Sequence, residues 1–369
     1  MRPTVVEIDL GAIAENIRTI RHKVAPSEIM AVVKANGYGH GADEIARTAI
    51  ENGATWLAVA LVEEGIELRK HGFTEPILVF AGELETQLEA ALQHNLQISV
   101  TYPEIISPLL ETARRLHKTA NVHVKVDTGM GRVGIAWNEA ADIIQQLLSH
   151  QNIKVQGLYT HFATSDERDK TYAMQQLNFF RRVIAEVEQR GIRIPVIHAA
   201  NSGAILDMPE TYFNLVRPGI MMYGYYPSNE TSESVAIRPA MTFKTHVIQV
   251  KKVPAGTSIS YGRKFITKQE TYIATLPVGY ADGYNRLLTN RSYVLIQGRR
   301  YPVVGRVCMD LIMCDLGLES DIRVGDEVIL FGSQISEEIK VEEWCELLDT
   351  IPYEVCCCVS ARVPRVFKQ

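Results

Sequence analysis

Short apolar runs recur along the N-terminal part of the chain and alternate with segments of helical spacing. Most are rich in Val, Ile and Leu without polar alternation, a pattern typical of strands buried on both faces. Eight such runs occupy residues 29–33, 56–60, 76–80, 97–100, 122–126, 155–160, 196–199 and 214–216.

Between these runs lie segments such as "LVEEGIELRKHG", "ELETQLEAALQHN" (83–95) and "AMQQLNFFRRVIAEVEQRG", several of which stop at Gly or Asn as helices do. Eight alternating strands and helices fit a (β/α)8 barrel, which usually needs about 250 residues. A doubly wound open sheet fits the same count.

The pattern changes after residue 232. "TFKTHVIQVKKVPAGTSISYG", "YVLIQGRRYPVVGRVCMDLIMCDLG" and "VGDEVILFG" are strand-like segments broken by Gly and Pro, and only "VEEWCELLD" has helical spacing. The sequence therefore predicts an α/β protein with an N-terminal (β/α)8 barrel, residues 1–232, and a C-terminal, mostly β domain, residues 233–369.

Composition narrows the class of protein. A net charge of −5 argues against a nucleic-acid or anionic-membrane surface, and no apolar segment reaches the length of a transmembrane helix. The N-terminus has no signal-peptide core, so we expect a cytoplasmic protein. Cys356, Cys357 and Cys358 are consecutive, which suits neither disulfides nor a metal site, and we expect the cysteines to be small buried side chains.

Ionisable side chains follow the strands at their C-terminal ends, where barrel enzymes place their active sites. The loops after the predicted strands 7 and 8, "NSG" and "RPGI", suit a bound phosphate group. A phosphate-bearing cofactor beside a strand-end lysine suggests pyridoxal phosphate held as a Schiff base. The ionisable and polar residues at these ends are Lys34, Tyr38, Lys125, Asp127, Arg132, His161, Asn201, Ser202 and Arg217.

Nine motifs in order resemble those of the alanine racemase family over nearly the whole chain. They are "VVKANGYGHG", with Gly37 where the family usually has Ala, "VDTGMGR", "HFATSD", "NSG", "RPGIMMYG", "SYG", "GYADG", "VCMD" and "PYEV". The resemblance implies a pyridoxal 5'-phosphate enzyme that interconverts L- and D-alanine, supplies D-alanine for peptidoglycan, and works as a homodimer with active sites shared between chains.

The resemblance also implies two bases. Lys34 would hold the cofactor and act at one face of the substrate α-carbon, and Tyr261 would act at the opposite face. Racemisation requires a proton to leave one face and return to the other. A phenol needs cationic neighbours to give up its proton near neutral pH.

Other residues match the family's cofactor and substrate contacts. Arg217 would face the pyridine nitrogen and, because a guanidinium only donates, leave that nitrogen unprotonated. His161 would lie against the ring or Arg217. Arg132 would contact the cofactor's phenolic oxygen and the substrate carboxylate, and Lys125 stands where many relatives carry a carbamylated lysine.

The remaining expected contacts are with the phosphate group, the substrate and the access route. Asn201 would contact the cofactor. Its phosphate would be held by Tyr38, Ser202, Tyr353 and the backbone of Gly219 and Ile220. Met309 would bind the substrate carboxylate through its backbone, with Asp310 beside it, and Tyr280 would narrow the gate together with Tyr353. Asp166, Arg286 and Arg306 match the outer corridor.

Three alternative functions remain on the sequence alone. A broader alanine/serine racemase would share all these motifs. A decarboxylase on the same barrel would be expected to place an acid at the pyridine nitrogen, where Arg217 stands. A single-barrel pyridoxal-phosphate carrier would lack the segments containing "SYG" and "VCMD". No metal site is expected.

Overall fold

The computed structural model describes residues 2–82 and 84–369, and the chain divides into two compact units. Ala12–Arg238 form one, called the barrel unit, while the chain up to Gly11 joins Pro239–Gln369 in the other, called the β unit. Residues up to Gly11, which the sequence analysis placed with the barrel, thus belong to the β unit. Glu83, where the expected helical segment 83–95 begins, lies outside the described residues.

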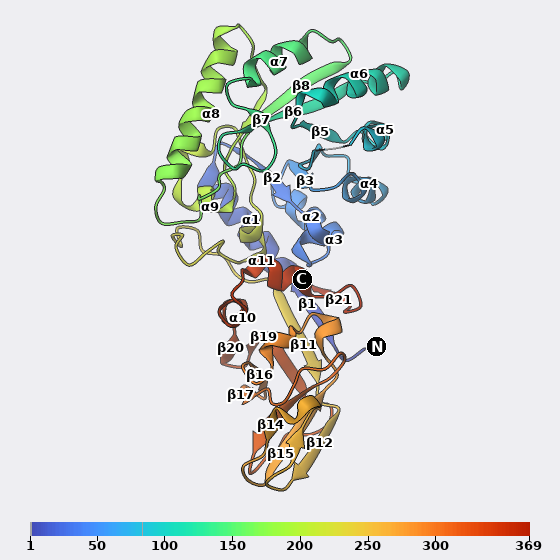
Figure 1. Ribbon diagram of the computed structural model, residues 1–369, viewed down its shortest axis with the longest axis vertical. Coiled ribbons are helices and arrows are strands. Elements are labelled where there is room, and N and C mark those ends of the chain that lie inside the picture. The colour runs from blue at the N-terminus through green and yellow to red at the C-terminus, as the bar shows by residue number, and fades with distance from the viewer. Residues whose placement is uncertain (1, 83) are drawn as a thin grey trace. The chain divides into compact units, whose positions relative to one another are not determined.

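Eight parallel strands follow one another around the barrel unit in the order β10-β2-β3-β4-β5-β6-β8-β9 (Figure 1). The last strand along the chain, β10, pairs with the first, β2. The segments of β9 and β10 have no strand pairing but are joined by backbone hydrogen bonds from Asn214 to Ile197 and from Arg217 to Ala200. The ring of neighbours is therefore nearly closed, which distinguishes a barrel from a doubly wound sheet. The predicted (β/α)8 barrel is therefore confirmed. Its strands are β2 (Glu28–Val32), β3 (Trp56–Val59), β4 (Ile77–Val79), β5 (Gln97–Val100), β6 (Ala120–Asp127), β8 (Ile153–Tyr159), β9 (Val196–His198) and β10 (Leu215–Val216), with β7 (Ile135–Ala136) beside β6.

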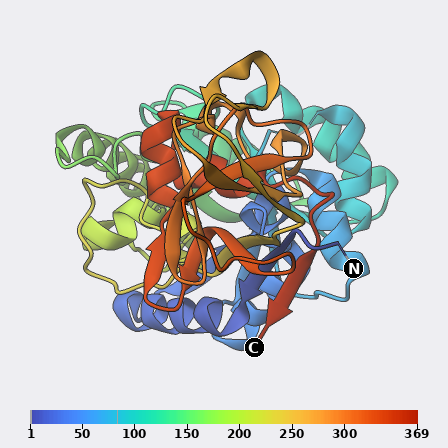
Figure 2. The ribbon, with the colours of Figure 1, turned by 90° about the horizontal axis from the view of Figure 1, so that it is seen from below.

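Helices form the outer layer of the barrel unit (Figure 2). In α6, for example, the buried residues Ile106, Leu109 and Ala113 recur at helical spacing on one face, while every residue of β3 and β5 is buried. The helices are α1 (Leu10–Val24), α2 (Lys34–Tyr38), α3 (Ala42–Glu51), α4 (Val62–Lys70), α5 (Glu85–Gln93), α6 (Ile106–Arg115), α7 (Ala140–Leu148), α8 (Thr171–Gln189) and α9 (Ser202–Asp207), with 3-10 turns η1 (Pro103–Ile105), η2 (Pro209–Thr211) and η3 (Ile220–Tyr223).

The β unit contains a large sheet ordered β17-β16-β19-β11-β1-β21, with β20 beside β19, and the smaller sheets β12-β15-β18 and β13-β14. β1 runs antiparallel to β11 and parallel to β21. The strands are β1 (Val5–Asp9), β11 (Met241–His246), β12 (Gln249–Val253), β13 (Ser258–Ile259), β14 (Phe265–Ile266), β15 (Thr271–Leu276), β16 (Tyr293–Ile296), β17 (Arg299–Pro302), β18 (Ile312–Gly317), β19 (Glu327–Gln334), β20 (Glu337–Ile339) and β21 (Arg365–Lys368).

Helical segments in the β unit are more numerous than the sequence pattern indicates. Besides the expected helix α10 (Val341–Leu348), the unit has α11 (Pro352–Cys358) and the 3-10 turns η4 (Tyr261–Arg263), η5 (Tyr280–Asp282) and η6 (Arg286–Leu288). The consecutive cysteines therefore lie in a helix. Cys356 is buried as expected, but Cys357 and Cys358 are exposed, so the expectation of burial was wrong for these two.

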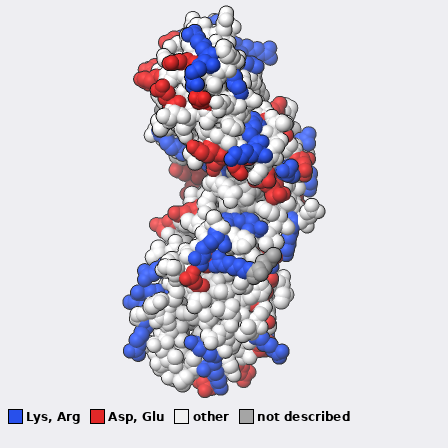
Figure 3. Space-filling model, turned by 90° about the vertical axis from the view of Figure 1, so that its right-hand side faces the viewer, with Lys and Arg blue, Asp and Glu red and all other residues white. Residues whose placement is uncertain are grey.

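Charges of both signs are mixed over the face seen in Figure 3, where Lys and Arg side chains lie among Asp and Glu side chains. Among the described residues, no helix combines the length and the apolarity needed to span a bilayer.

Candidate active site

Lys34 follows β2 and begins a short turn, α2, whose backbone is left-handed. Ala35, Asn36, Gly37 and Tyr38 have φ angles of 53°, 52°, 60° and 51°. For residues other than glycine this conformation costs roughly 1–2 kcal/mol each. Backbone strain of this kind persists where surrounding contacts enforce it, and it is frequent at functional sites. The left-handed backbone next to Lys34 is thus a structural reason, independent of the sequence motif, to consider this lysine a functional residue.

Glu64 is the residue that holds this turn, a role that was not predicted from the sequence. Its Oε1 accepts the N–H of Ala35 at 2.6 Å, and its Oε2 accepts those of Ala60 at 2.8 Å and Leu61 at 3.1 Å. One carboxylate therefore ties the residue after Lys34 to the end of the neighbouring strand β3. The two sites lie 29 residues apart in the sequence, and no local pattern connects them.

We expect Glu64→Ala to lower the free energy of unfolding by roughly 1–3 kcal/mol, because three backbone N–H groups lose a charged acceptor. Urea unfolding of the full chain measures this change. Glu63→Ala is the matched control, because Glu63 is an exposed acid in the same first turn of α4. Equal midpoints for the two variants would contradict the assigned role of Glu64.

Tyr38, Ser202 and Gly219 form a group, called the cradle, where α9 and η3 begin. The Oγ atom of Ser202 accepts the N–H of Gly219 at 3.0 Å and lies 3.5 Å from the nitrogen of Met221. A Cβ atom on Gly219 would lie only 2.7 Å from the hydroxyl of Tyr38. Glycine therefore keeps the space between Tyr38 and Ser202 open, and the predicted phosphate contacts Tyr38, Ser202, Gly219 and Ile220 come from one region of the barrel unit.

Asn201 serves this region as the N-cap of α9. Its Oδ1 accepts the N–H of Ala204 at 3.0 Å and lies 2.8 Å from the hydroxyl of Ser165. Its amide thus fixes the first turn of the helix that carries Ser202, which is a structural contribution next to the cradle.

Arg217 is buried, with 3% of its surface exposed. Its Nη2 donates to the carbonyls of Thr160 at 2.8 Å and Ala199 at 2.9 Å and lies 3.4 Å from Nδ1 of His161, while Nη1 lies 3.0 Å from Nδ1 of His198. None of these contacts uses Nε. Burial lowers the pKa of Arg217 to about 10, so the guanidinium stays charged at neutral pH.

A chain of side chains behind Arg217 escaped the sequence analysis. Arg217 can only donate, so Nδ1 of His198 accepts; the Nε2–H of His198 then donates to Nδ1 of His123 at 2.9 Å. His123 in turn donates through Nε2 to Gln97 at 2.8 Å. Burial and the charge of Arg217 lower the pKa of His123 to about 3 and that of His198 well below its usual value. Both imidazoles are therefore neutral, and three strands, β5, β6 and β9, fix the orientation of Arg217.

Lys34, Lys125, Arg132 and Arg217 form a cationic group around His161. Burial, followed by Arg217 and then by the other three cations, lowers the pKa of His161 well below its usual value. Lys125 is 4% exposed, and burial, together with Arg132 and Arg217, lowers its pKa to about 8. Arg132 itself is exposed in the loop after β6. An excess of positive charge in this region favours anionic ligands.

The β unit exposes a second set of predicted residues. Tyr261 is 71% exposed, Met309 53% and Tyr280 43%. The N–H of Tyr280 donates to the carbonyl of Cys308 at 3.0 Å, and the hydroxyl of Ser260 donates to that of Arg306 at 2.6 Å. The turns that carry Tyr261 and Tyr280 are thereby joined by hydrogen bonds to the segment 306–309, which contains Met309.

The other predicted residues fall in both units. Arg306 is half-buried near Gly262, where a Cβ atom would lie 3.7 Å from its Cζ. Arg286 is exposed and begins η6, and Tyr353 is half-buried in α11. Asp166 lies in the barrel unit, in the loop after β8. Asp310 forms an ion pair with Arg362, so its side chain has a structural partner.

The structure therefore gathers the predicted residues into two sets, one in each unit. Among the described residues, no group of three or more His, Cys, Asp or Glu side chains is arranged to hold a metal ion.

Comparison with known protein families and structures identifies the chain. Residues 8–227 match the family model described as the N-terminal domain of alanine racemase, and residues 240–367 match that of its C-terminal domain. The chain belongs to the alanine racemase family. Alanine racemase 2 of Caldanaerobacter subterraneus subsp. tengcongensis is 46% identical and covers 100% of this chain and 95% of its own length. Alanine racemase of Clostridium novyi is 45% identical, over 100% and 96%.

Solved structures of the family have the same fold. Alanine racemase of Clostridium difficile 630 superposes with a TM-score of 0.96 at 40% identity, covering 99% of this chain and 96% of that one. Its complex with cycloserine gives a TM-score of 0.94 at 39% identity, with 100% and 96% covered.

The residues of the barrel unit fit the cofactor that the alanine racemase family implies. Pyridoxal phosphate requires an amine for attachment, an anion cradle and a partner for its ring nitrogen. Lys34 provides the amine, and Arg217 provides a donor fixed by its neighbours. The cradle between Tyr38 and Ser202, which a Cβ atom on Gly219 would fill, is the observation that supports this fit.

Proposed function

We propose that this chain is a pyridoxal-phosphate-dependent alanine racemase that interconverts L- and D-alanine. The single observation that carries the proposal is the left-handed turn after Lys34 beside the Tyr38–Ser202–Gly219 cradle, within a chain of the alanine racemase family. A racemase acting in the cytoplasm would supply D-alanine for peptidoglycan.

The experiment that tests this function is an assay of the purified chain with pyridoxal phosphate and several L-amino acids, with products resolved by chiral chromatography. We expect D-alanine from L-alanine and L-alanine from D-alanine. Turnover of serine at a rate comparable to alanine would favour the broader alanine/serine racemase. Release of carbon dioxide without D-alanine would contradict the proposal.

In this function, the chain's own residues bind and orient the reactants. The bound cofactor supplies an electron-withdrawing group that makes the α-proton of an attached amino acid acidic. The phosphate would be held by Tyr38, Ser202 and the backbone N–H groups of Gly219 and Ile220. Arg217 would donate through Nε to the ring nitrogen; because a guanidinium does not give up its proton, this nitrogen stays unprotonated.

Proton movement would be divided between two groups. The ε-amine of Lys34 would take or return the proton at one face of the α-carbon, and the phenol of Tyr261 would do so at the other. Arg132 and the backbone N–H of Met309 would bind the substrate carboxylate, which keeps the α-carbon between the two bases. Tyr280 and Tyr353 would narrow the gate, and Asp166, Arg286 and Arg306 would line the corridor outside it.

We further propose that two copies of the chain assemble and share their active sites. Tyr261, Tyr280, Met309 and Leu287, all in the β unit, are large and apolar or amphipathic and are between 43% and 71% exposed. Exposed apolar groups gathered on one unit are typical of an interaction surface. In a two-fold assembly, the β unit of each copy would complete the barrel site of the other.

Carbamylation of Lys125 requires a neutral amine, and the structure favours one. With a pKa of about 8, about half of the Lys125 amines are neutral at pH 8 and about a tenth at pH 7. With 13C-bicarbonate, we therefore expect an NMR carbamate signal that rises between pH 7 and pH 9. The signal should vanish in Lys125→Met; its persistence there would contradict the assignment.

A further inference from the structure

An ion pair within the barrel unit, Lys170 with Asp207, lies outside the site described above. The Nζ of Lys170 lies 3.1 Å from Oδ2 of Asp207 and donates to the carbonyl of Ser165 at 2.8 Å and to that of Glu167. These three acceptors match the three N–H bonds of an ammonium group. The side chains of Lys170 and Asp207 are only 21% and 13% exposed, so both charges are largely withdrawn from water.

This ion pair joins a loop to the helix that carries Ser202. Lys170 ends the loop after β8, and Asp207 is the last residue of α9, whose first residue is Ser202. The same loop contacts the other end of α9, where the hydroxyl of Ser165 lies 2.8 Å from Oδ1 of Asn201. The loop therefore lies along α9 from one end to the other.

The first turn of α9 also has no free space toward this loop. A Cβ atom on Gly203 would lie 2.8 Å from the carbonyl oxygen of Ser165 and 3.0 Å from the nitrogen of Asp166. Since α9 has only six residues, it has little stability as an isolated helix. Its position must come from contacts such as these.

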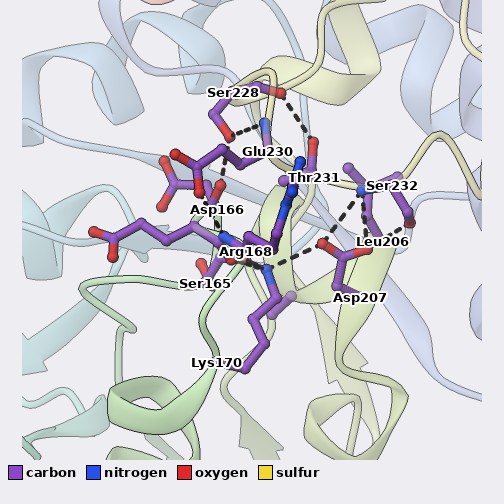
Figure 4. Close-up of polar contacts among 12 residues, drawn as sticks. Ser165, Asp166, Arg168, Lys170, Leu206, Asp207, Ser228, Glu230, Thr231 and Ser232 are labelled. Carbon is purple, nitrogen blue, oxygen red and sulfur yellow. Dashed lines mark hydrogen bonds and ion pairs between the residues drawn. The ribbon is translucent and has the colours of Figure 1, made fainter.

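A second segment, Ser228 to Ser232, supports the pair from another side (Figure 4). Asp207 accepts the N–H of Ser232 at 3.2 Å and also its hydroxyl. Glu230 accepts the N–H of Arg168 at 2.8 Å. Burial raises the pKa of Asp207, but hydrogen bonds from Ser232 and Lys170 outweigh it and lower the pKa below its usual value. Asp207 is therefore an anion at neutral pH, as pairing with Lys170 requires.

We propose that Lys170 and Asp207 are positioning residues for the cofactor's phosphate group. Their ion pair fixes α9 lengthwise against the loop after β8, and this holds the Ser202 hydroxyl where it accepts the N–H of Gly219. Both side chains would act through α9 and Ser202. The inference rests on the proposed function, because it assigns the Ser202 cradle to a phosphate.

The test compares two ligands that differ only in the phosphate. Dissociation constants of pyridoxal phosphate and of pyridoxal are measured by absorbance titration of the full chain after removal of cofactor. For Lys170→Met we expect pyridoxal phosphate to bind about tenfold more weakly, the effect of losing a charge-assisted contact. Pyridoxal, which lacks the phosphate, should bind as it does to the parent chain.

Two further variants separate positioning from loss of folding. Asp207→Asn keeps the size of the side chain and should weaken the binding of pyridoxal phosphate by a similar factor. The variant with both substitutions should bind pyridoxal phosphate no more weakly than either single variant, because each substitution removes the same ion pair. Lys244→Met is the matched control: Lys244 is 13% exposed and pairs with Glu327 at 2.7 Å in the β unit. It should leave both affinities unchanged.

The outcomes are distinguishable. Unchanged binding of pyridoxal phosphate to both Lys170→Met and Asp207→Asn would overturn the inference and leave the proposed function standing. Equal weakening of both ligands would also overturn it, because it would indicate a general loosening of the site. A parent chain that binds neither ligand would overturn the proposed function, and the inference with it.

Discussion

Replacing Lys34 by alanine is expected to abolish covalent attachment of the cofactor and to lower racemisation by more than the roughly 10²–10⁴-fold usual for loss of one acid–base group. The larger loss follows because Lys34 would both hold the cofactor and carry a proton. Chiral chromatography measures the rate. Borohydride reduction of the parent chain, followed by peptide mapping, should place the pyridoxyl label on the peptide containing Lys34.

Lys125 is the amine that could compete with Lys34 for the pyridoxyl label. Its pKa of about 8 leaves a substantial fraction of the amine neutral, and therefore reactive, near pH 8. The matched variant is Lys125→Met, which should still be labelled at Lys34. Label on Lys125 in the parent chain, or undiminished labelling of Lys34→Ala, would falsify the assignment of Lys34.

Mixing Lys34→Ala chains with Tyr261→Phe chains should restore about one quarter of the parental activity. Each single variant should be slower by roughly 10²–10⁴-fold or more. In a mixed dimer with shared sites, one site collects both defects, while the other regains both Lys34 and Tyr261. Random pairing makes about half of the dimers mixed, and half of their sites are then intact.

The experiment requires chains that dissociate and reassociate, which differently tagged chains verify by co-purification. The control is the mixture of Lys34→Ala with Glu63→Ala, in which the exposed Glu63 is unrelated to the proposed site. If verified mixed dimers of Lys34→Ala and Tyr261→Phe show only the average of the two variants, both bases belong to the same chain and the shared site is refuted.

Regular elements were predictable from the sequence where burial imposes a pattern. β3 and β4 lie buried on both faces of the barrel wall, so their residues are apolar without polar alternation. α11 was not predicted, because a run of three cysteines carries no helical periodicity. The place of β1 was also missed, since pairing with β11 and β21 depends on strands far away in the sequence.

The candidate site likewise has features that were predictable from the sequence and features that were not. Lys34 could be located because a charged residue at the end of a buried strand is conspicuous, but the left-handed turn after it could not, since Ala35 and Asn36 do not favour such a backbone without outside contacts. Tyr261 was found only through the resemblance. The chain His198–His123–Gln97 joins side chains of three strands, and only the folded barrel brings them within hydrogen-bond distance.

The placement of β1 has a consequence for how the protein is made. Synthesis delivers β1 first, but its neighbour β11 begins at Met241 and its neighbour β21 at Arg365. The barrel unit, whose strands pair mostly with the next strand along the chain, can form on the ribosome while β1 still lacks both partners. The large sheet of the β unit is therefore completed last, and a chain truncated before Arg365 would leave β1 as an unfinished edge of that sheet.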